Sequence, residues 1–400
     1  MFERTKTNGG ADDETIFDNL GRPIRMFSHG ATPEGQKPLR HMQVLGYDRL
    51  SGKVAKRSVL TAADTPDDQL VYDVFEYDSI GREVRHTTPW NATTTTNYDG
   101  FVIDSTDPLL QHTKTEIDVL GRPITVTDAA KGKTRYAYGP FGALRSITDP
   151  GYDVATWTRD AFGRVTQLEE PDRGLTVLKH NAFGDLIEST DALGRIVTFD
   201  LDALGRTKSR KDKLGAQILT TTWAWDTALH GIGRLHKVTS PDAIKTYSYT
   251  NRGQLESEML SVVGESFAAK MGYDELGRVK SVDYPQPLGE LPFGVMYEYD
   301  EHGFVIGVHE KNTNESFWTL QEVDNAGRMQ EERFGNGVET TRSYDKKKQT
   351  LKSISTTFGG AQIQDLAYDW NERLNLKSRT DTLQPQNKTE RFRYDELDRV

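Results

Sequence analysis

Short runs in which aromatic or apolar residues alternate with polar ones recur along most of the chain. Side chains two residues apart lie on the same face of a β-strand, so each run predicts a strand with its rings on one face. Thr, Val and Ile dominate the neighbouring positions, as in Thr93–Thr96 and Ile218–Thr222, and these residues favour a pleated, half-buried surface. We therefore expect an all-β chain. The clearest aromatic pairs are Phe75/Tyr77, Tyr136/Tyr138, Trp223/Trp225, Tyr247/Tyr249, Tyr297/Tyr299 and Phe392/Tyr394.

A turn phrase follows many of these runs: an aspartate, two further residues, a glycine and an arginine. Aspartate at the first position of a type I turn can accept hydrogen bonds from the backbone N–H groups that follow it. Glycine at the fourth position supplies the positive φ of a hairpin with a G1 bulge. The arginine starts the returning strand, where pairing with the aspartate would order the turn. The phrase occurs at Asp18–Arg22, Asp78–Arg82, Asp118–Arg122, Asp160–Arg164, Asp191–Arg195, Asp202–Arg206, Asp274–Arg278 and Asp324–Arg328.

These turn aspartates, or the residues that replace them, fall into a register that covers nearly the whole chain. Asp18, Asp48 and Asp78 are 30 residues apart, which predicts insertions in the first units. We expect one repeat array over residues 1–400, about sixteen units of roughly 21–30 residues with no internal domain boundary. Because Tyr394–Val400 reads as the opening of a further unit, we expect the chain to be a fragment of a longer one. From Asp118 onward the register runs through Gly139, Asp160, Asn181, Asp202, Asp226, Thr250, Asp274, Asp300, Asp324, Asp345, Asp369 and Asp395.

A second turn signal lies about ten residues after the first in many units. In Thr190–Arg195 this second turn has itself become TDALGR, which places Asp191 and Asp202 only 11 residues apart. Each unit then reads as strand, first turn, strand and second turn, so consecutive strands form antiparallel hairpins. Other second turns are Thr106–Pro108, Thr127–Asp128, Thr148–Gly151, Glu170–Gly174 and Ser240–Asp242.

The composition agrees with a thin, folded wall. Hydrophobic residues make up 35% of the chain and the mean hydropathy is −0.66, which is polar for a compact globule and suits a sheet wetted on at least one face. The aromatic content of 10% argues against disorder.

Charge and cysteine content exclude several classes of partner and site. The net charge is −10 and the 50 Lys and Arg residues are dispersed, so we expect no nucleic-acid partner. There is no cysteine, which excludes disulfides, thiolate metal sites and a cysteine nucleophile. No window approaches 18 apolar residues and the first residues lack an apolar signal region, so we expect no membrane span and see no signal peptide.

No constellation of residues indicates catalysis or cofactor binding. The chain has no G-x-S-x-G, H-E-x-x-H or Walker phrase, and Gly231 and Gly233 lack the third glycine of a dinucleotide loop. His230 and His236 straddle a turn, which is weak evidence for a metal site. Calcium at the turn aspartates is a further alternative, but the arginine after each aspartate would compete with the ion. We therefore expect no catalytic, cofactor-binding or metal-ligating residues and no cofactor.

The aromatic rows have two interpretations. They can pack across strands along the wall, or exposed rings can stack on sugars or peptides. Four tryptophans, Trp90, Trp157, Trp318 and Trp370, lie outside the best rows and are weak candidates for contact surfaces. Asn91, Asn314 and Asn387 begin N-x-S/T triplets, which we interpret as coincidental matches to glycosylation acceptors.

The combined pattern, x-Y-x-Y-D-x-x-G-R followed by T-D-P-x-G, resembles the YD repeat of the RHS family over roughly residues 17–400. EYDSIGR (Glu76–Arg82), GYDELGR (Gly272–Arg278) and EYDEHGF (Glu298–Phe304) carry this resemblance. FGNG at Phe334–Gly337 and IQDLAYDWN at Ile363–Asn371 are similar to the RHS stretch of bacterial Tc-type insecticidal toxin B and C components and of teneurin-like shells. The resemblance implies one long β-sheet that spirals into a hollow shell. The self-cleaving RHS core of such proteins is not found in these 400 residues.

Three hypotheses for function follow. The first is a non-catalytic segment of the shell of a bacterial RHS or Tc-like toxin, which encapsulates a C-terminal toxic domain until delivery. Its partners would be that cargo and other parts of the shell or toxin complex, and the full-length protein would be secreted or at the cell surface. The second is an extracellular adhesion module that binds cell-surface carbohydrate or protein. The third, and least favoured, is an enzyme.

Overall fold

The chain is an array of short antiparallel strands, as predicted. The computed structural model describes residues 2–6, 12–286, 292–383 and 387–400, which hold 35 strands of one sheet and two short 3₁₀ turns, η1 (Asp67–Gln69) and η2 (Pro140–Gly142). No helix of the described residues is long and apolar enough to cross a membrane. The strands are β1 (Phe2–Lys6), β2 (Asp12–Phe17), β3 (Pro23–His29), β4 (Arg40–Tyr47), β5 (Val54–Ser58), β6 (Thr61–Ala62), β7 (Tyr72–Tyr77), β8 (Glu83–Thr87), β9 (Thr93–Asp99), β10 (Val102–Thr106), β11 (His112–Ile117), β12 (Pro123–Thr127), β13 (Lys133–Tyr138), β14 (Leu144–Thr148), β15 (Val154–Arg159), β16 (Val165–Glu170), β17 (Gly174–His180), β18 (Leu186–Thr190), β19 (Ile196–Leu201), β20 (Thr207–Leu214), β21 (Gln217–Trp225), β22 (Leu235–Thr239), β23 (Ala243–Tyr249), β24 (Leu255–Val262), β25 (Glu265–Tyr273), β26 (Val279–Asp283), β27 (Gly294–Tyr299), β28 (Val305–Glu310), β29 (Ser316–Val323), β30 (Met329–Phe334), β31 (Val338–Tyr344), β32 (Leu351–Phe358), β33 (Ala361–Trp370), β34 (Leu376–Asp381) and β35 (Lys388–Arg391).

The strands follow one another as hairpins, with one exception near the N-terminus. Strand β4 pairs through His41 with β6 and through Leu45 with β5, and β5 then continues the array by pairing with β7. Residues between β5 and β7 thus form a side branch, which accounts for one of the insertions predicted from the 30-residue intervals. Among the described residues, β1 pairs only with β2 and β35 only with β34, so the sheet stays open.

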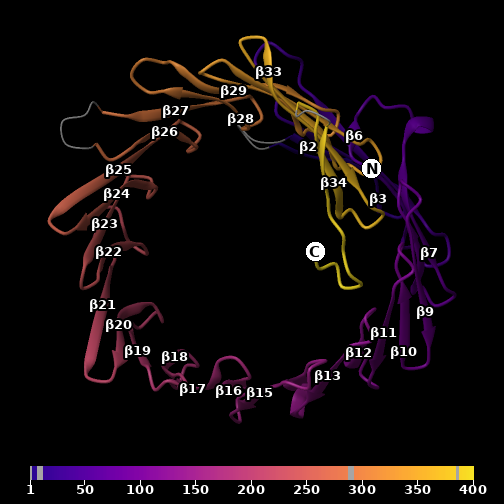
Figure 1. Cartoon of the computed structure of the whole chain (residues 1–400). Coiled ribbons are helices and arrows are strands. Elements are labelled where there is room, and N and C mark those ends of the chain that lie inside the picture. Colours follow the sequence, from indigo (N-terminus) through magenta and orange to yellow (C-terminus); the bar gives the residue numbers. More distant parts are fainter. Residues whose placement is uncertain (1, 7–11, 287–291, 384–386) are drawn as a thin grey trace.

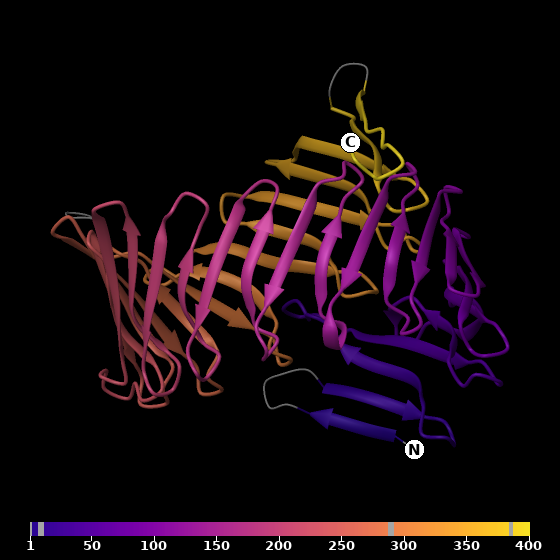
Figure 2. The same cartoon turned by 90° about the horizontal axis from the view of Figure 1, so that it is seen from below.

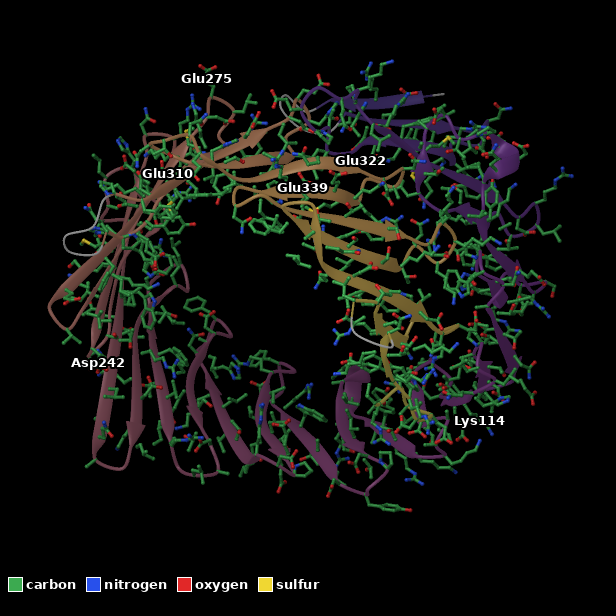
Figure 3. The ribbon with its side chains drawn as sticks, turned by 45° about the horizontal axis from the view of Figure 1, so that its top comes forward. Lys114, Asp242, Glu275, Glu310, Glu322 and Glu339 are labelled. Carbon is green, nitrogen blue, oxygen red and sulfur yellow. The ribbon has the colours of Figure 1, made fainter. Side chains whose placement is uncertain are left out.

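The sheet curves into a ring and rises as it turns. Figure 1 looks along the axis of the ring, and the late strands β29, β33 and β34 return to the region of β2, β3 and β6. Figure 2 shows the C-terminal strands above the N-terminal ones, so the strip forms slightly more than one turn of a spiral. Side chains follow both faces of the ribbon, and none of those drawn reaches across the ring (Figure 3).

The wall is one sheet thick and has almost no hydrophobic core. Apart from two prolines, only six apolar side chains of the described residues are buried, and none of them lies between residues 93 and 294. A single sheet has no second layer to cover its faces, so the units must be held by contacts between neighbouring hairpins. The six are Met42, Ala62, Ala92, Val295, Ile306 and Leu320.

The hairpin turns lie along two opposite rims. We call the row of turns that follow the aromatic strands the D rim, and the row at the other strand ends the second rim. The D rim holds the turns that begin at Asp18, Asp48, Asp78, Asp99, Asp118, Gly139, Asp160, Asn181, Asp202, Asp226, Thr250, Asp274, Asp300, Asp324, Asp345, Asn371 and Asp395.

Two details of the predicted register are wrong. The turn assigned to Asp369 begins at Asn371, whose N–H donates to the Asn375 carbonyl, because Asp369 still belongs to β33. A two-residue turn between β9 and β10, at Gly100 and Phe101, went unrecognised because it lacks the arginine. The final copy of the phrase has Asp398 in place of glycine, and Asp398 adopts the left-handed φ of 59° itself.

Candidate functional site

Each D-rim phrase builds one compact turn, seen well at Asp118. Its Oδ1 accepts hydrogen bonds from the N–H groups of Leu120 (2.9 Å) and Arg122 (3.0 Å), and its Oδ2 accepts one from Arg122 Nε (2.7 Å). Gly121 has a φ of 77°, as a G1 bulge requires. The Arg122 side chain, and then its backbone N–H, holds the pKa of Asp118 below its usual 3.8. The carboxylate is therefore fully engaged by its own turn.

The arginine also ties each unit to the next. The Arg122 Cζ lies 4.4 Å from the ring centroid of Tyr138, a cation–π distance. Tyr138 in turn donates its hydroxyl hydrogen to the carbonyl oxygen of Pro123, 2.8 Å away. Aspartate, arginine and the next tyrosine thus form one chain of contacts between hairpins, which we call the clamp. The same aromatic–arginine pairing occurs in Tyr47/Arg22, Tyr98/Arg82, Trp225/Arg206, Tyr299/Arg278 and Tyr344/Arg328.

Other residues can take the tyrosine's place in the clamp. Trp370 Nε1 donates to the Leu351 carbonyl at 2.7 Å, and Arg159 donates to the Leu144 carbonyl at 3.1 Å. Trp157 lies two residues before Arg159 in β15 and so shares its face. Placing Trp157 and Trp370 outside the aromatic rows was therefore wrong. The rows tolerate any side chain that can reach the neighbouring carbonyl.

Trp318 and Trp90, the other two of the four tryptophans singled out from the sequence, have hydrogen-bond partners within the chain. Trp318 Nε1 donates to the carboxylate of the buried Glu332, 2.7 Å away. Trp90 Nε1 donates to the carbonyl of Glu372 at 3.2 Å, across 282 residues of sequence. Both indole N–H groups are therefore hydrogen-bonded within the chain.

The contact of Trp90 belongs to a seam where the strip meets itself after one turn. We define the seam as the contacts between the second rim of residues 29–111 and the D rim of residues 300–398. Thr32 N–H donates to Asp300 Oδ2 (2.7 Å), and Gln36 Nε2 donates to the Gln321 carbonyl (2.6 Å). These pairs lie 268 and 285 residues apart in sequence. Among the described strands no pairing crosses the seam, and contacts at the rims join the two turns of the spiral.

Histidines occupy the N-terminal part of the seam. His41 is 3% exposed and its Nδ1 donates to the Asn325 carbonyl at 3.2 Å. A Cβ on Gly30 would lie 2.2 Å from His41 Nε2, and one on Gly327 would lie 2.7 Å from it, so the ring fits only between two glycines. Burial, with a smaller contribution from His29, lowers the pKa of His41 below its usual 6.5. Nothing in the sequence pattern distinguishes these histidines.

Arg373 anchors the other end of the seam. It bonds Gln111 Oε1 at 2.6 Å and Asp107 Oδ2 at 3.0 Å on the second rim. It also pairs with Asp398 of the next D-rim turn. Arg373 thus joins three turns: its own, the one at Asp107 and the one at Asp395.

The described residues contain no cluster of three or more potential metal ligands. His236 Nδ1 lies 2.6 Å from Thr227 Oγ1, which is an ordinary polar contact. One groove of about 370 Å³ runs over β18–β21, but its only hydroxyl is that of Ser189 and no histidine lines it.

The N-x-S/T triplets have a conformational explanation. Asn91, Asn314 and Asn387 have φ values of 66°, 61° and 49°, and asparagine tolerates this left-handed region better than most residues. A threonine or serine then begins or flanks the following strand. The triplets therefore arise from turn chemistry.

Comparisons with known proteins agree with the repeat assignment. A family model described as RHS Repeat matches residues 118–154 and 180–217. No curated protein matches the chain.

Solved structures of Tc toxins share the fold. The crystal structure of TcdB2-TccC3 superimposes with a TM-score of 0.83 at 17% identity, covering 97% of this chain. A Photorhabdus luminescens Tc holotoxin pore gives a TM-score of 0.82 at 17% identity with the same coverage. This chain spans 23% of the length of either matched chain. The resemblance to RHS/YD-repeat shells is confirmed, as is the all-β fold.

Proposed function

We propose that this chain is a non-catalytic segment of the wall of a Tc-like toxin shell, and that it acts by containment. It would keep a C-terminal toxic domain away from its targets until delivery. Its partners would then be that cargo and the other parts of the shell, and the complete protein would be secreted or displayed at the cell surface. The fold shared with Tc toxin structures supports the assignment as a shell segment. The containment role is a further step that this shared fold alone does not carry.

The observation that carries the proposal is the seam. Because Asp300 and Gln321, at the D-rim ends of their hairpins, contact second-rim residues 268 and 285 positions earlier, further units would extend a tube rather than a flat sheet. A tube encloses a volume, and a wall one sheet thick maximises that volume for a given chain length. The described residues form one such sheet and hold no cluster of three or more potential metal ligands, which is consistent with a wall.

Limited proteolysis of the complete polypeptide that carries residues 1–400 tests containment. Arg373→Glu should open the seam, because it places a carboxylate against Asp107 and Asp398. Arg379→Glu is the matched control, since Arg379 pairs with Glu390 of the adjacent strand, away from the seam. We expect a segment outside the array to resist protease in the wild type and the control, and to be cut in Arg373→Glu.

Two results would overturn containment. One is a polypeptide in which every segment outside the array is cut equally fast in the wild type and in Arg373→Glu. The other is the absence of any protected cargo, covalent or bound. Adhesion, the second hypothesis, predicts instead that the intact wild type binds cells and that opening the seam leaves cleavage unchanged.

A further inference from the structure

The two ends of the seam differ in the groups that can change charge. We call the contacts of residues 29–41 with residues 300–327 the histidine end. The contacts of residues 90–111 with residues 371–398 are the arginine end. Histidine is the side chain that ordinarily changes charge between about pH 5 and 8, so the two ends should respond differently to mild acid.

His41 is the group at the histidine end that is least suited to a positive charge. Its side chain is buried, and its Nδ1 donates to the Asn325 carbonyl at 3.2 Å. Its Nε2 is also buried and has no hydrogen-bond partner among the residues that the structure describes. Gly30 and Gly327 close around this nitrogen and bring no side chain to it. Protonation would therefore bury an N–H group without an acceptor, which costs free energy.

The charged groups around His41 act in both directions, and burial outweighs them. Burial lowers the pKa of His41 below 6.5, and the positive charge of His29 adds to this effect. The Asn325 carbonyl and the carboxylate of Asp324 oppose it. Asp300, on the neighbouring D-rim turn, accepts a hydrogen bond from the Thr32 N–H at 2.7 Å. The other charged or titratable groups near His29 are Arg4, Glu14, Arg40 and His302.

The arginine end keeps its charges over the same pH range. Arg373 pairs with Asp107 and Asp398, and arginine and aspartate ordinarily both stay charged between about pH 5 and 8. His112 lies close to this end in sequence, but it is exposed and bonds Asp104 of its own hairpin at 3.3 Å. A change in its charge therefore acts within one hairpin rather than across the seam.

We propose that the seam is an acid-operated gate, which opens at the histidine end in mild acid while the arginine end holds the two turns of the spiral together. Opening exposes His41 to water, so the open form binds a proton more readily than the closed form. Its population should rise as the pH falls below 6.5, by at most about tenfold per pH unit because one ring titrates. Both sides of the seam belong to this chain, so the gate does not depend on what covers the free rims or on whether the wall contains a cargo.

Distances across each end of the seam test the proposal. The chain has no cysteine, so introduced cysteines take spin labels only where they are placed. Glu34→Cys with Glu322→Cys reports on the histidine end, and Lys114→Cys with Lys377→Cys reports on the arginine end. All four replaced side chains are exposed. Double electron–electron resonance measures each distance distribution in the 400-residue chain over a pH series from about 7.5 to about 5.

Two glutamine variants separate His41 from histidine content in general. His41→Gln keeps an amide donor for the Asn325 carbonyl but cannot take up a proton, so it should lose the opening in acid. His112→Gln is the matched control, because it removes an exposed histidine outside the seam contacts, and it should open as the wild type does. Circular dichroism checks that both variants keep the sheet.

We expect the Glu34/Glu322 pair to gain a longer component as the pH falls, and the Lys114/Lys377 pair to stay unchanged. An equal change at both ends would indicate general acid unfolding and would overturn the gate, as would an unchanged distance at the histidine end. A wild-type response that survives in His41→Gln would do the same. If His41→Gln is open at every pH, the wild-type series decides, and opening that is complete above pH 6.5 or steeper than about tenfold per pH unit would exclude His41 as the trigger.

Discussion

The imidazole rings of His29 and His302 stack face to face, with centroids 4.3 Å apart and 8° between their planes. One ring comes from the first turn of the spiral and the other from the D rim of the second. Close by, His41 is buried against the Asn325 carbonyl. Three imidazole rings therefore lie together at one end of the seam, and burial lowers the pKa of one of them, His41.

Acidification should loosen this end of the seam. The folded pKa of His41 lies below its unfolded value of 6.5 because of burial, although Asp324 and the Asn325 carbonyl oppose the shift. The unfolded group then binds more protons near pH 6, so the stabilisation is complete above about pH 6.5 and is lost as the pH falls below it. We expect faster hydrogen exchange, corrected for intrinsic rates, at residues 29–41 and 300–327 at about pH 5.5 than at about pH 7.5.

His41→Gln provides the comparison for this prediction. It removes the ring whose pKa burial lowers, so the response to pH should shrink. Residues 118–170, on the opposite wall (Figure 1), serve as the internal reference. An equal pH response in both regions would show that the histidines do not control the seam.

The D-rim turns should lose their stability together at lower pH. The pKa of Asp18 is held below 3.8, first by the Arg22 backbone N–H, and that of Asp118 first by the Arg122 side chain. A depressed folded pKa gives stability that is present above pH 3.8 and lost as the pH falls through the folded value. We expect cooperative loss of sheet circular dichroism below about pH 4. Replacing Asp118 by Asn, which still accepts the backbone bonds but loses the charge, should make that region less sensitive to acid.

The contribution of the clamp to the free energy of unfolding should be measurable at Tyr299. Its hydroxyl donates to the Val279 carbonyl at 2.7 Å, and its ring centroid lies 4.4 Å from Arg278 Cζ. Tyr299→Phe keeps the ring and removes one hydrogen bond, so the free energy of unfolding should fall by about 0.5–1.5 kcal/mol. Tyr136→Phe is the control, because no hydrogen bond of its hydroxyl is observed, and it should change stability by less than about 0.5 kcal/mol. Equal effects of the two substitutions in urea unfolding would contradict the clamp.

On the D rim, replacing a glycine by alanine should lower the free energy of unfolding only where the glycine has a positive φ. Gly121 has a φ of 77° and open space around the position of a Cβ. Gly121→Ala should therefore cost about 1–2 kcal/mol of unfolding free energy through conformation alone. Gly139 on the same rim has a φ of −91°, so Gly139→Ala should be tolerated within about 0.5 kcal/mol. Thermal unfolding of the two variants decides the matter, and a tolerated Gly121→Ala would refute the bulge assignment.

Interactions between residues close in sequence determine most of the strands and turns of the wall. An aspartate, a glycine and an alternating aromatic run specify a turn and two strands without reference to distant residues, because turn hydrogen bonds and side-chain alternation act over a few residues. That is why turns as different as those at Asp118 and Asn181 were placed correctly. Asp369 was misplaced by two residues because Asn371 can form the same turn, and the residue type alone does not separate them.

The aromatic rows were only half explained by the sequence. Alternation placed Tyr138 on one face of its strand, but its partner, Arg122, lies in the preceding unit and belongs to the neighbouring turn. The clamp can be inferred from the sequence if the arginine of the turn phrase is taken to contact the next unit as well as the aspartate of its own turn. The roles of Trp90 and Trp370 could not, since one contacts a turn 282 residues away and the other substitutes for a tyrosine.

The sequence by itself determined the strands, the turns and their order, because each depends on interactions between close neighbours. Only the tertiary structure decided where the strip meets itself. That meeting depends on the curvature that accumulates over more than 260 residues, as the contacts of Thr32 with Asp300 and of Gln111 with Arg373 show. A small twist per strand, summed over the whole sheet, selects which histidine, arginine and glycine face each other across the seam. No local pattern encodes that sum, so the seam became visible only when the ring was complete.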